Sequence, residues 1–333
     1  MKGKVALEEH FALEETLEDS LYEDWFPAWA DMRRRLLDLH DLRLQEMDKH
    51  GIAFSILSLQ NPAVQRMPET DRAIELAQRA NDVLAQAIAK RPDRFGGFAA
   101  LPMQDPEAAI VELTRCVRDL GFLGANVNGF SEVGTPGAAV YLDDDRYLPF
   151  WATVEELGVP FYLHPRDPVR TEAIYKGHPW FRGSAWAFGA ETSLHALRLM
   201  ASGLFDRYPK LNVVLGHLGE GLPFTIWRAD HRISRTPRGI PARRQMADYL
   251  RENFYVTTSG SFRTQALINT MLEVGSDRIL FSVDYPFEDA VEAADWFDNA
   301  PISETDRVKI GRTNAEVLFK LGGPQKKLRV ARS

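Results

Sequence analysis

Two carboxylates and a histidine follow the first apolar run of the chain. In "VALEEHF", residues 5–11, the apolar segment leads directly into Glu8, Glu9 and His10. Side chains alternate along a strand, so Glu8 and His10 should point to one side and Glu9 to the other. Carboxylate oxygens and imidazole nitrogens are ligands that first-row divalent metal ions take. The stretch therefore predicts two ligands of a metal site.

Polar residues also follow the later apolar runs, and two of them extend this set. His164 stands in "LHPR" and Asp284 in "SVDYPFE", each at the end of such a run. A single histidine at a strand end is more often hydrogen-bonded scaffolding than a ligand. Two imidazoles and two carboxylates from three separate runs instead favour one divalent ion, with room for water or substrate. We predict the ligand set Glu8, His10, His164 and Asp284.

His217 and Glu220 form a second candidate pair, three residues apart in "GHLGE". Glu220 would hold the imidazole of His217 and set its charge, as a general acid or base requires. A hydrogen-bonded cap at a helix start is the alternative for this pair. Asn128, in "NVNG", is a candidate partner for a substrate hydroxyl. Arg228 could steady a carboxylate or a second hydroxyl, and a surface or subunit-contact role is equally compatible with its position.

Other polar residues are interpreted as structural. The hydroxyls of "TTSGSF", residues 257–262, have no base partner visible in the sequence, so they are expected to support the site rather than act as nucleophiles. His195 falls at helical spacing in "ETSLHALRLM" and should be packed. The one cysteine, Cys116, cannot form an internal disulfide and is expected to be buried.

Eight short apolar runs alternate with helical segments and must position these residues. Alternation of this kind is typical of parallel strands with crossover helices, and eight units predict an α/β fold, a (β/α)8 TIM barrel with a helical insertion after strand one. Asp105, Pro106 and Gly121 mark the start and stop of one helix, and Ser303 with Asp306 the start of another. A doubly wound sheet is the alternative, but no glycine-rich phosphate loop follows the first strand. The runs are Lys4–Leu7, Phe54–Leu59, Phe95–Leu101, Phe122–Val127, Pro160–Leu163, Leu211–Leu215, Phe254–Thr257 and Arg278–Ser282.

Composition restricts the class of protein. The 333 residues are 45% hydrophobic, which suits one large domain over residues 1–333, with 322–333 as a flexible tail. A net charge of -7 argues against nucleic acid or an anionic membrane as the main partner. We expect a cytoplasmic protein, because the start lacks a secretory apolar segment and no apolar run reaches membrane-spanning length.

The chain resembles the amidohydrolase superfamily from Gly3 to about Leu321. The usual His-x-His of strand one reads Glu8-x-His10 here, which is similar to the branch of non-oxidative aromatic acid decarboxylases. The chain departs from that branch at Asn126, at Tyr285 and over Ser20–Asp31. The resemblance rests on "GKVALEEHFA", "RPDRFGGFAALPMQDP", "VPFYLHPRDP", "ALRLMASGLFD", "LGHLGEGLPF", "RILFSVDYPFE" and "DRVKIGRTNAEVLFKL".

The resemblance implies a reaction as well as a fold. It implies reversible, metal-dependent, non-oxidative decarboxylation of an ortho-hydroxybenzoate, with Asp284 as proton donor and Phe287 at the substrate. The expected substrate is 2,6-dihydroxybenzoate, which would give resorcinol and CO2, with 2,3-dihydroxybenzoate or salicylate as alternatives. The ion would be Mn2+ or Zn2+, and no organic cofactor is needed because the ortho oxygen pushes electron density onto the ring.

Two other functions stay open on the sequence. A metal-dependent amide or lactone hydrolase could use the same barrel, although strand four lacks a lysine that could bridge two ions. The second alternative is a non-catalytic barrel with a structural metal. The presence of both His217 and Glu220 beside the ligand set argues against this function. The resemblance also implies a homo-oligomer, a tetramer or dimer. We expect the aromatic segment Tyr22–Trp29 and the loop "RTPRGIPARRQ" to form its contacts.

Overall fold

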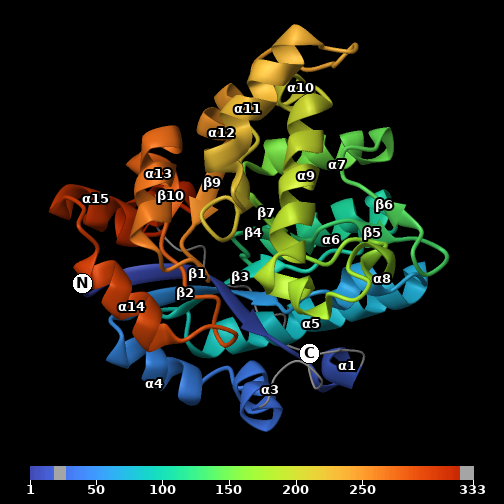
Figure 1. Ribbon diagram of the computed structural model, residues 1–333. Helices are drawn as coiled ribbons and strands as arrows, with labels where there is room; N and C mark the ends of the chain where they lie inside the picture. Colours follow the sequence, from blue (N-terminus) through green and yellow to red (C-terminus); the bar gives the residue numbers. More distant parts are fainter. Residues whose placement is uncertain (19–27, 323–333) are drawn as a thin grey trace.

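The computed structural model describes residues 1–18 and 28–322, and its centre is a sheet of eight parallel strands (Figure 1). Strands adjacent in the sheet follow one another along the chain, apart from the small β5–β6 hairpin. This is the order of a barrel, as predicted, and not of a doubly wound sheet. The strands are β1 (Lys4–Phe11), β2 (Ile52–Leu59), β3 (Phe95–Ala99), β4 (Gly124–Asn128), β7 (Phe161–His164), β8 (Val213–Leu215), β9 (Phe254–Thr257) and β10 (Ile279–Leu280).

The barrel closes between its last and first strands mainly through the segment after β10. The Ser282 hydroxyl accepts hydrogen bonds from the backbone N–H groups of Leu7, at 3.2 Å, and Glu8, at 2.7 Å. Beyond it, Glu9 and Tyr285 form a parallel bridge, and His10 N–H donates to the Tyr285 carbonyl at 2.6 Å. The chain that carries Asp284 is therefore joined directly to the strand that carries Glu8 and His10.

Helices follow the strands and cover the outside of the barrel (Figure 1). The predicted helical insertion after strand one is present as α1 (Glu14–Glu18), α3 (Trp29–Leu37) and α4 (Leu42–Lys49). The other helices are α5 (Thr70–Lys90), α6 (Pro106–Arg118), α7 (Leu148–Leu157), α8 (Thr171–Ile174), α9 (Ala187–Ala201), α10 (Leu204–Arg207), α11 (Leu222–Arg235), α12 (Met246–Asn253), α13 (Thr264–Val274), α14 (Ala290–Asn299), α15 (Glu304–Val308) and α16 (Asn314–Leu318).

Short helical turns and one hairpin complete the described chain. The hairpin pairs β5 (Ser131–Glu132) with β6 (Ala139–Val140), and the sequence analysis did not predict it. The turns are η1 (Ala63–Arg66), η2 (Asp145–Tyr147), η3 (Pro179–Phe181), η4 (Gly183–Ala185), η5 (Ser276–Arg278) and η6 (Lys309–Thr313).

The predicted helix starts are confirmed at atomic detail. The Asp105 carboxylate accepts from the N–H groups of Glu107 and Ala108, with Pro106 in the first turn of α6. The Ser303 hydroxyl accepts from Asp306 N–H at 3.1 Å at the start of α15. These caps satisfy backbone donors that no helical carbonyl can reach.

Two apolar clusters stabilise the barrel. The larger lies between the strands and the surrounding helices, and it includes the buried Cys116. The smaller takes residues from six strands together with Ala315 and Phe319, and it fills the inside of the barrel. Residues of one strand alternate between the clusters, as Ala6 and Leu7 do. The inside core is apolar below the polar ends of the strands.

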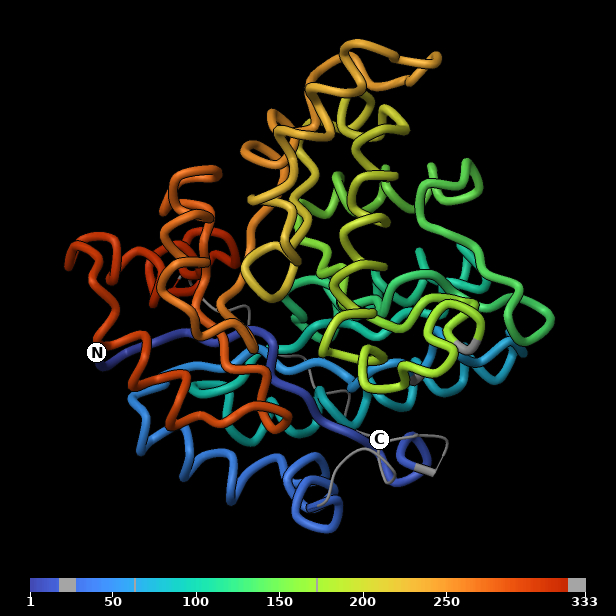
Figure 2. The backbone as a smooth tube through the Cα atoms, in the orientation of Figure 1, coloured from blue at the N-terminus to red at the C-terminus, as the bar shows by residue number. Residues whose placement is uncertain are grey.

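The ends of the described chain meet other elements at the amino side of the barrel. Figure 2 shows the first residues beside the C-terminal helices, where the Met1 amino group pairs with Asp298 at 2.5 Å. Residues 323–333 of the predicted tail and residues 22–27 of the predicted aromatic contact segment lie outside the described ranges. Among the helices within those ranges, none has the length and hydropathy that a membrane span requires.

Candidate active site

An irregularity in β1 directs Glu8 and His10 toward the carboxyl end of the barrel. Ala6 pairs with Ser55 and Glu9 with Leu57, so β1 has one more residue between these pairs than β2. An extra residue of this kind re-aims the side chains that follow it. Leu7 therefore packs inside the barrel below Glu8, and both Glu8 and His10 are buried.

The structure brings all four predicted ligands together. One ligand atom from each of Glu8, His10, His164 and Asp284 lies within 4.8 Å of the others. His164 Nε2 is 3.3 Å from Glu8 Oε1, and His10 Nε2 is 3.1 Å from Asp284 Oδ1. Glu9 is directed away, as predicted: its Oε1 accepts from the Ser282 hydroxyl and the Val283 N–H.

The atoms that face one another in this group suit a divalent cation. Within the described residues, Glu8 Oε1, His10 Nε2 and Asp284 Oδ1 are buried without an aligned hydrogen bond. Buried polar atoms are normally satisfied, and a cation between them would satisfy all three. The other ring nitrogens are already occupied: His10 Nδ1 is 3.1 Å from the Ser58 hydroxyl, and His164 Nδ1 is 3.0 Å from its neighbour's carbonyl. Such partners fix the rings with Nε2 toward the ion.

His217 and Glu220 lie beside this group and are hydrogen-bonded to each other. His217 Nδ1 is 2.6 Å from Glu220 Oε1, and His217 Nε2 is 3.5 Å from Asp284 Oδ2. His217, Glu220 and Asp284 all have positive φ, between 51° and 79°. Non-glycine residues adopt this conformation at a cost, and such residues gather at functional sites. The turn after β8 therefore holds the hydrogen-bonded His217–Glu220 pair next to one predicted ligand, in a backbone conformation that is unfavourable for these residue types.

Two glycines make the close approach of these side chains possible. A Cβ atom at position 216 would lie 3.0 Å from Glu8 Oε1 and 3.3 Å from Glu220 Oε1. A Cβ at position 260, where φ is +57°, would lie 3.0 Å from His217 Cδ2. Real Cβ contacts at such distances are rare, so these positions require glycine for the site to keep its geometry.

The carboxylates and imidazoles of the site lie close enough to shift one another's pKa values. Burial raises the pKa of Glu8, but the charge of His217 and the nearby imidazole of His164 outweigh it and lower the pKa to about 2. Burial likewise opposes ionisation of Asp284, yet His10 and His217 hold its pKa well below the usual range. Burial lowers the pKa of His217, but Glu220 and Glu8 hold it well above its ordinary value. The arrangement favours two carboxylates and a protonated His217.

Of the predicted substrate contacts, Asn128 and Phe287 contact residues of this site, and Arg228 is exposed without a described contact to the ligand group. Asn128 is buried at the end of β4, where its Nδ2 donates to Gln65 Oε1 at 3.3 Å and its Oδ1 has no partner among the described residues. The Phe287 ring centroid is 5.6 Å from that of His10. Arg228 is exposed on α11, beside Trp227. No hydrogen bond or ion pair within the described residues joins Arg228 to the ligand group.

Sequence reasoning missed Tyr162 and Glu288, which lie at the site. Tyr162, inside an apolar strand, donates to Glu8, and only its strand position could have signalled it. Thr257 and Ser259 also donate to Glu8, which agrees with the supporting role predicted for "TTSGSF". Glu288 stands four residues after Asp284. Burial, and then the charge of Asp284, raise the pKa of Glu288 to about 7.

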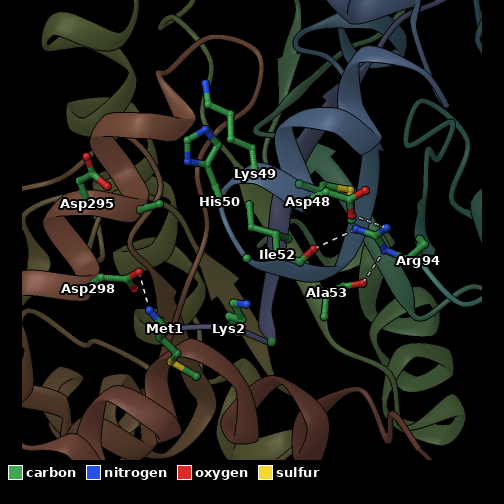
Figure 3. Close-up of a pocket in the computed structure, with 14 residues that line it drawn as sticks. Met1, Lys2, Asp48, Lys49, His50, Ile52, Ala53, Arg94, Asp295 and Asp298 are labelled. Atoms are coloured by element: carbon green, nitrogen blue, oxygen red, sulfur yellow. Dashed lines mark hydrogen bonds and ion pairs between the residues drawn. The ribbon is translucent and has the colours of Figure 1, made fainter.

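A separate hollow lies at the opposite end of the barrel. It has a volume of about 640 Å³ and is lined by residues at the amino ends of β1 and β2, with Arg94 and Asp298 (Figure 3). Arg94 donates there to the carbonyl groups of Ile52 and Ala53. None of the four predicted ligands lines it. Active sites of such barrels form at the carboxyl ends of the strands, so we place the chemistry at the ligand group.

An eight-stranded parallel barrel with histidine and carboxylate ligands at its carboxyl end defines a class of metal-dependent barrel enzymes. The chain belongs to the amidohydrolase family, whose family model matches residues 10–321. It is 60% identical over 326 residues to the gamma-resorcylate decarboxylase of Rhizobium sp. (strain MTP-10005), which covers 97% of this chain and 100% of the relative.

Solved structures agree with this assignment. A crystal structure of a 2,6-dihydroxybenzoate decarboxylase complexed with 2,6-dihydroxybenzoate superposes with a TM-score of 0.94 at 60% identity, over 96% of this chain and 100% of that chain. The dihydroxybenzoic acid decarboxylase of Polaromonas sp. JS666, with bound manganese and the inhibitor 2-nitroresorcinol, gives a TM-score of 0.93 at 58% identity. That match covers 96% of this chain and 98% of the other.

Proposed function

We propose that the chain is a metal-dependent carboxy-lyase that removes CO2 from an ortho-hydroxybenzoate, reversibly and without oxidation. The proposed substrate is 2,6-dihydroxybenzoate and the products are resorcinol and CO2. The observation that carries the proposal is the four-ligand group with the hydrogen-bonded His217–Glu220 pair at its side. The similarity to dihydroxybenzoate decarboxylases over nearly the full length supports the choice of substrate.

The proposed cofactor is one divalent ion, Mn2+ or Zn2+, held by Glu8, His10, His164 and Asp284, with no organic cofactor. When bound, such an ion supplies positive charge that attracts the substrate carboxylate and favours ionisation of its ortho hydroxyl. Manganese in the structure of the Polaromonas relative supports Mn2+ as the first choice. Two imidazoles and two carboxylates are equally suitable for Zn2+.

Asp284 and His217 are proposed to deliver the proton that replaces CO2. His217 Nε2 lies 3.5 Å from Asp284 Oδ2, so a proton held by His217 can pass to Asp284. Asp284 takes this proton as the substrate anion enters and passes it to the ring carbon that bears the carboxylate. The carbon–carbon bond then breaks, its electron pair restores the aromatic ring, and CO2 leaves. Glu220 keeps the imidazole of His217 oriented throughout.

Asn128 and Phe287 are proposed to position the ring. Asn128 Oδ1 is a buried acceptor, and a hydroxyl of the substrate would satisfy it. Phe287 packs against the apolar cluster of Ala12, Leu17 and Leu36 and lies next to the His10 ring. An aromatic substrate could stack beside it. A second ortho hydroxyl therefore has a candidate partner, which favours 2,6-dihydroxybenzoate over salicylate.

A substrate panel tests the proposal. The purified protein, loaded with Mn2+, is incubated with 2,6-dihydroxybenzoate, 2,3-dihydroxybenzoate, salicylate and 4-hydroxybenzoate, and loss of each acid and release of CO2 are followed. We expect kcat/KM to be greatest for the 2,6-isomer and the 4-hydroxy acid to be inert, because only an ortho oxygen can chelate together with the carboxylate. Comparable turnover of 4-hydroxybenzoate would contradict the proposal, and preference for the 2,3-isomer would change the substrate alone.

The protein is further proposed to form a homo-oligomer. Helix α11 exposes Phe224 and Trp227, and the adjoining helix α13 exposes Leu272, with 82%, 67% and 84% of each residue accessible. Together, three such side chains expose roughly 500 Å² of surface, which is about the area of the largest apolar patch on a typical monomer. A stable interface buries ~800 Å² on each partner, so these side chains could supply much of one. A second copy of the chain is the proposed occupant.

Two expectations from the sequence stay predictions. The single-domain organisation of residues 1–333 and the cytoplasmic location rest on composition and pattern alone. In the predicted contact loop "RTPRGIPARRQ", most residues are exposed, and it extends beyond the barrel with α11 at the top of Figure 1. That position leaves it available for a contact between subunits.

A further inference from the structure

We infer that the hydroxyl groups of Tyr162, Thr257 and Ser259 hold Glu8 as a ligand through one oxygen only, and so keep coordination positions open for a chelating substrate. The inference deepens the proposed function and rests on it for the identity of the substrate. The part that concerns metal coordination does not depend on the reaction. The three residues are positioning residues, since they act through Glu8.

All three hydroxyls converge on the same oxygen of Glu8. Tyr162 OH and Ser259 Oγ donate to Glu8 Oε2, and Thr257 Oγ1 lies 3.0 Å from it. The three residues come from β7 and β9 and the turn after β9, and all are fully buried. Thr257 Oγ1 is also 2.7 Å from Ser259 Oγ and 3.1 Å from Tyr162 OH, so the three hydroxyls form one connected group around this oxygen. Because buried polar groups are normally hydrogen-bonded, this group holds Glu8 Oε2 in place.

The other oxygen of Glu8, Oε1, has different surroundings. Oε1 is buried without an aligned hydrogen bond within the described residues, and it lies 3.3 Å from His164 Nε2, on the side of the predicted ligands. The Gly216 backbone lies close beside this carboxylate, since a Cβ added there would be 3.0 Å from Oε1 and 3.1 Å from Oε2. The carboxylate is thus fixed with Oε1 toward the ligand group and Oε2 toward the hydroxyls.

This division determines how many positions a bound ion has left. Ions such as Mn2+ favour about six ligand atoms, and a carboxylate can fill one position or two. Four residues that give one atom each leave about two positions, the number that a carboxylate and an ortho hydroxyl occupy together. A Glu8 that bound through both oxygens would leave about one. The hydroxyls therefore make the site suitable for a two-oxygen ligand.

The test removes the hydroxyls and measures the open positions directly. The variants are Ser259→Ala, Tyr162→Phe and the double variant Thr257→Val/Ser259→Ala. Each is titrated with Mn2+ alone, and water-proton relaxation reports exchangeable water on the ion. We expect Mn2+ to bind with a Kd within about threefold of the unmodified protein, because Oε2 becomes a ligand as it loses its donors. The relaxation enhancement per bound ion should fall by about half in the double variant.

The kinetic readout follows from the same change. In Mn2+-loaded enzyme the KM for 2,6-dihydroxybenzoate should rise about tenfold in the double variant, with a smaller change in kcat. The hydroxyl-conserving variants Thr257→Ser and Ser259→Thr should keep both values near those of the unmodified enzyme. A merely structural role would not produce this separation of KM from kcat or its rescue by another hydroxyl.

Tyr147→Phe is the matched control. Tyr147 is also a fully buried tyrosine, but its hydroxyl donates to the Met103 carbonyl at 2.7 Å, away from Glu8. If the double variant folds and its water-proton relaxation enhancement per bound Mn2+ is unchanged, the inference is overturned. A loss of Mn2+ affinity of tenfold or more would also overturn it, because the hydroxyls would then only hold Glu8 in place as a ligand. If the double variant does not fold, Ser259→Ala decides by the same two criteria. If the unmodified protein binds Mn2+ but releases no CO2, the proposed function fails while the relaxation result still stands.

Discussion

At the scale of single residues, the site depends on which atom each side chain leaves free. His10 and His164 each use Nδ1 for a protein partner and keep Nε2 for the ligand group. Glu8 keeps Oε1, and Asp284 keeps Oδ1 while Oδ2 faces His217. Removal of one proposed ligand should therefore have a different effect from removal of the proposed proton donor, although both should stop the reaction.

His164→Ala and Asp284→Asn should both abolish decarboxylation, for different reasons. The alanine variant loses a nitrogen ligand and should bind metal at least tenfold more weakly. The asparagine variant keeps an oxygen that can coordinate, so it should retain much of its metal, but it cannot pass a proton to the ring. Metal content by elemental analysis and CO2 release by a coupled assay separate the two effects. Full activity of metal-free Asp284→Asn protein would refute the whole site assignment.

The buried His195 gives a pH dependence of stability that is independent of the active site. It is packed in α9, where its Nε2 accepts from Leu142 N–H at 3.0 Å. Burial first, and then the charge of Arg198, lower its pKa from 6.5 to about 3. Below pH 6.5 the unfolded chain binds a proton that the folded chain excludes. The stability that neutral His195 provides is thus present above pH 6.5 and lost as the pH falls toward 3.

His195→Gln should remove this dependence. Between pH 7 and pH 5 the free energy of unfolding of the unmodified protein should fall by about 2 kcal/mol more than that of the variant. Urea unfolding at the two pH values, with the same metal loading, measures the difference. His178→Gln is the control, because His178 is exposed and its replacement should leave the pH dependence as it was. Parallel pH profiles for His195→Gln and the unmodified protein would contradict the prediction.

At the scale of elements, the sequence predicted which segments form strands, but not how the last strand pairs with the first or where a strand carries an extra residue. All eight runs are strands, and their polar ends gather as expected because carboxyl ends of parallel strands share one edge. β10 covers only Ile279–Leu280, however, and the closure depends on the Ser282 hydroxyl and a bridge at Glu9. Contacts between side chains so distant in sequence leave no periodic signal, so neither this closure nor the extra residue in β1 could be predicted.

The same limit applies to the site. The clustering of the four predicted ligands and of the His217–Glu220 pair could be predicted, because their residue types are unusual at the ends of apolar runs. Tyr162 reads as one more apolar residue of a buried strand, and its bond to Glu8 depends on the distance between β7 and β1 across the barrel. Arg228 was a candidate by charge and spacing, but its helical phase exposes it on α11.

The η1 turn is predicted to act on the substrate through Asn128. Gln65, in this turn, accepts from both the backbone N–H and the side chain of Asn128, and donates to the Leu101 carbonyl at 2.8 Å. Gln65→Leu keeps the approximate volume but removes these bonds, so Asn128 loses its orientation. We expect KM for 2,6-dihydroxybenzoate to rise about fivefold, the effect of one hydrogen bond, with a smaller change in kcat.

The control for Gln65→Leu is a residue that supports the same turn without touching Asn128. Gln104 donates to the carbonyl groups of Val64 and Met67 at the two ends of η1. Gln104→Leu should lower the melting temperature but change KM less than Gln65→Leu. An equal rise of KM in both variants would mean that the turn as a whole, and not the contact with Asn128, governs substrate binding.

At the scale of the whole molecule, the barrel separates chemistry from assembly. The ligand group and the His217–Glu220 pair lie at the carboxyl ends of the strands. The ligand group is buried, and the His217 side chain is partly accessible to solvent. The exposed apolar residues lie on the outside of α11 and α13. Because α11 begins at Leu222, two residues after Glu220, a partner that covers this helix would also restrain the turn that carries the proposed catalytic pair. Assembly and activity should therefore be linked.

Trp227→Glu should shift the protein toward monomers. Trp227 is two-thirds exposed and stacks on His231 with ring centroids 4.9 Å apart, so the substitution leaves the core of the barrel unchanged while placing a charge in the proposed contact. A buried unpaired charge at an interface costs several kcal/mol, enough to weaken association by at least a hundredfold. Light scattering at micromolar concentration measures the mass, and circular dichroism checks the fold. Val111→Glu is the matched control, since Val111 is exposed on α6 away from α11. If the unmodified chain is itself a monomer, or if both variants keep the same oligomeric mass, the α11 surface is not the contact between copies.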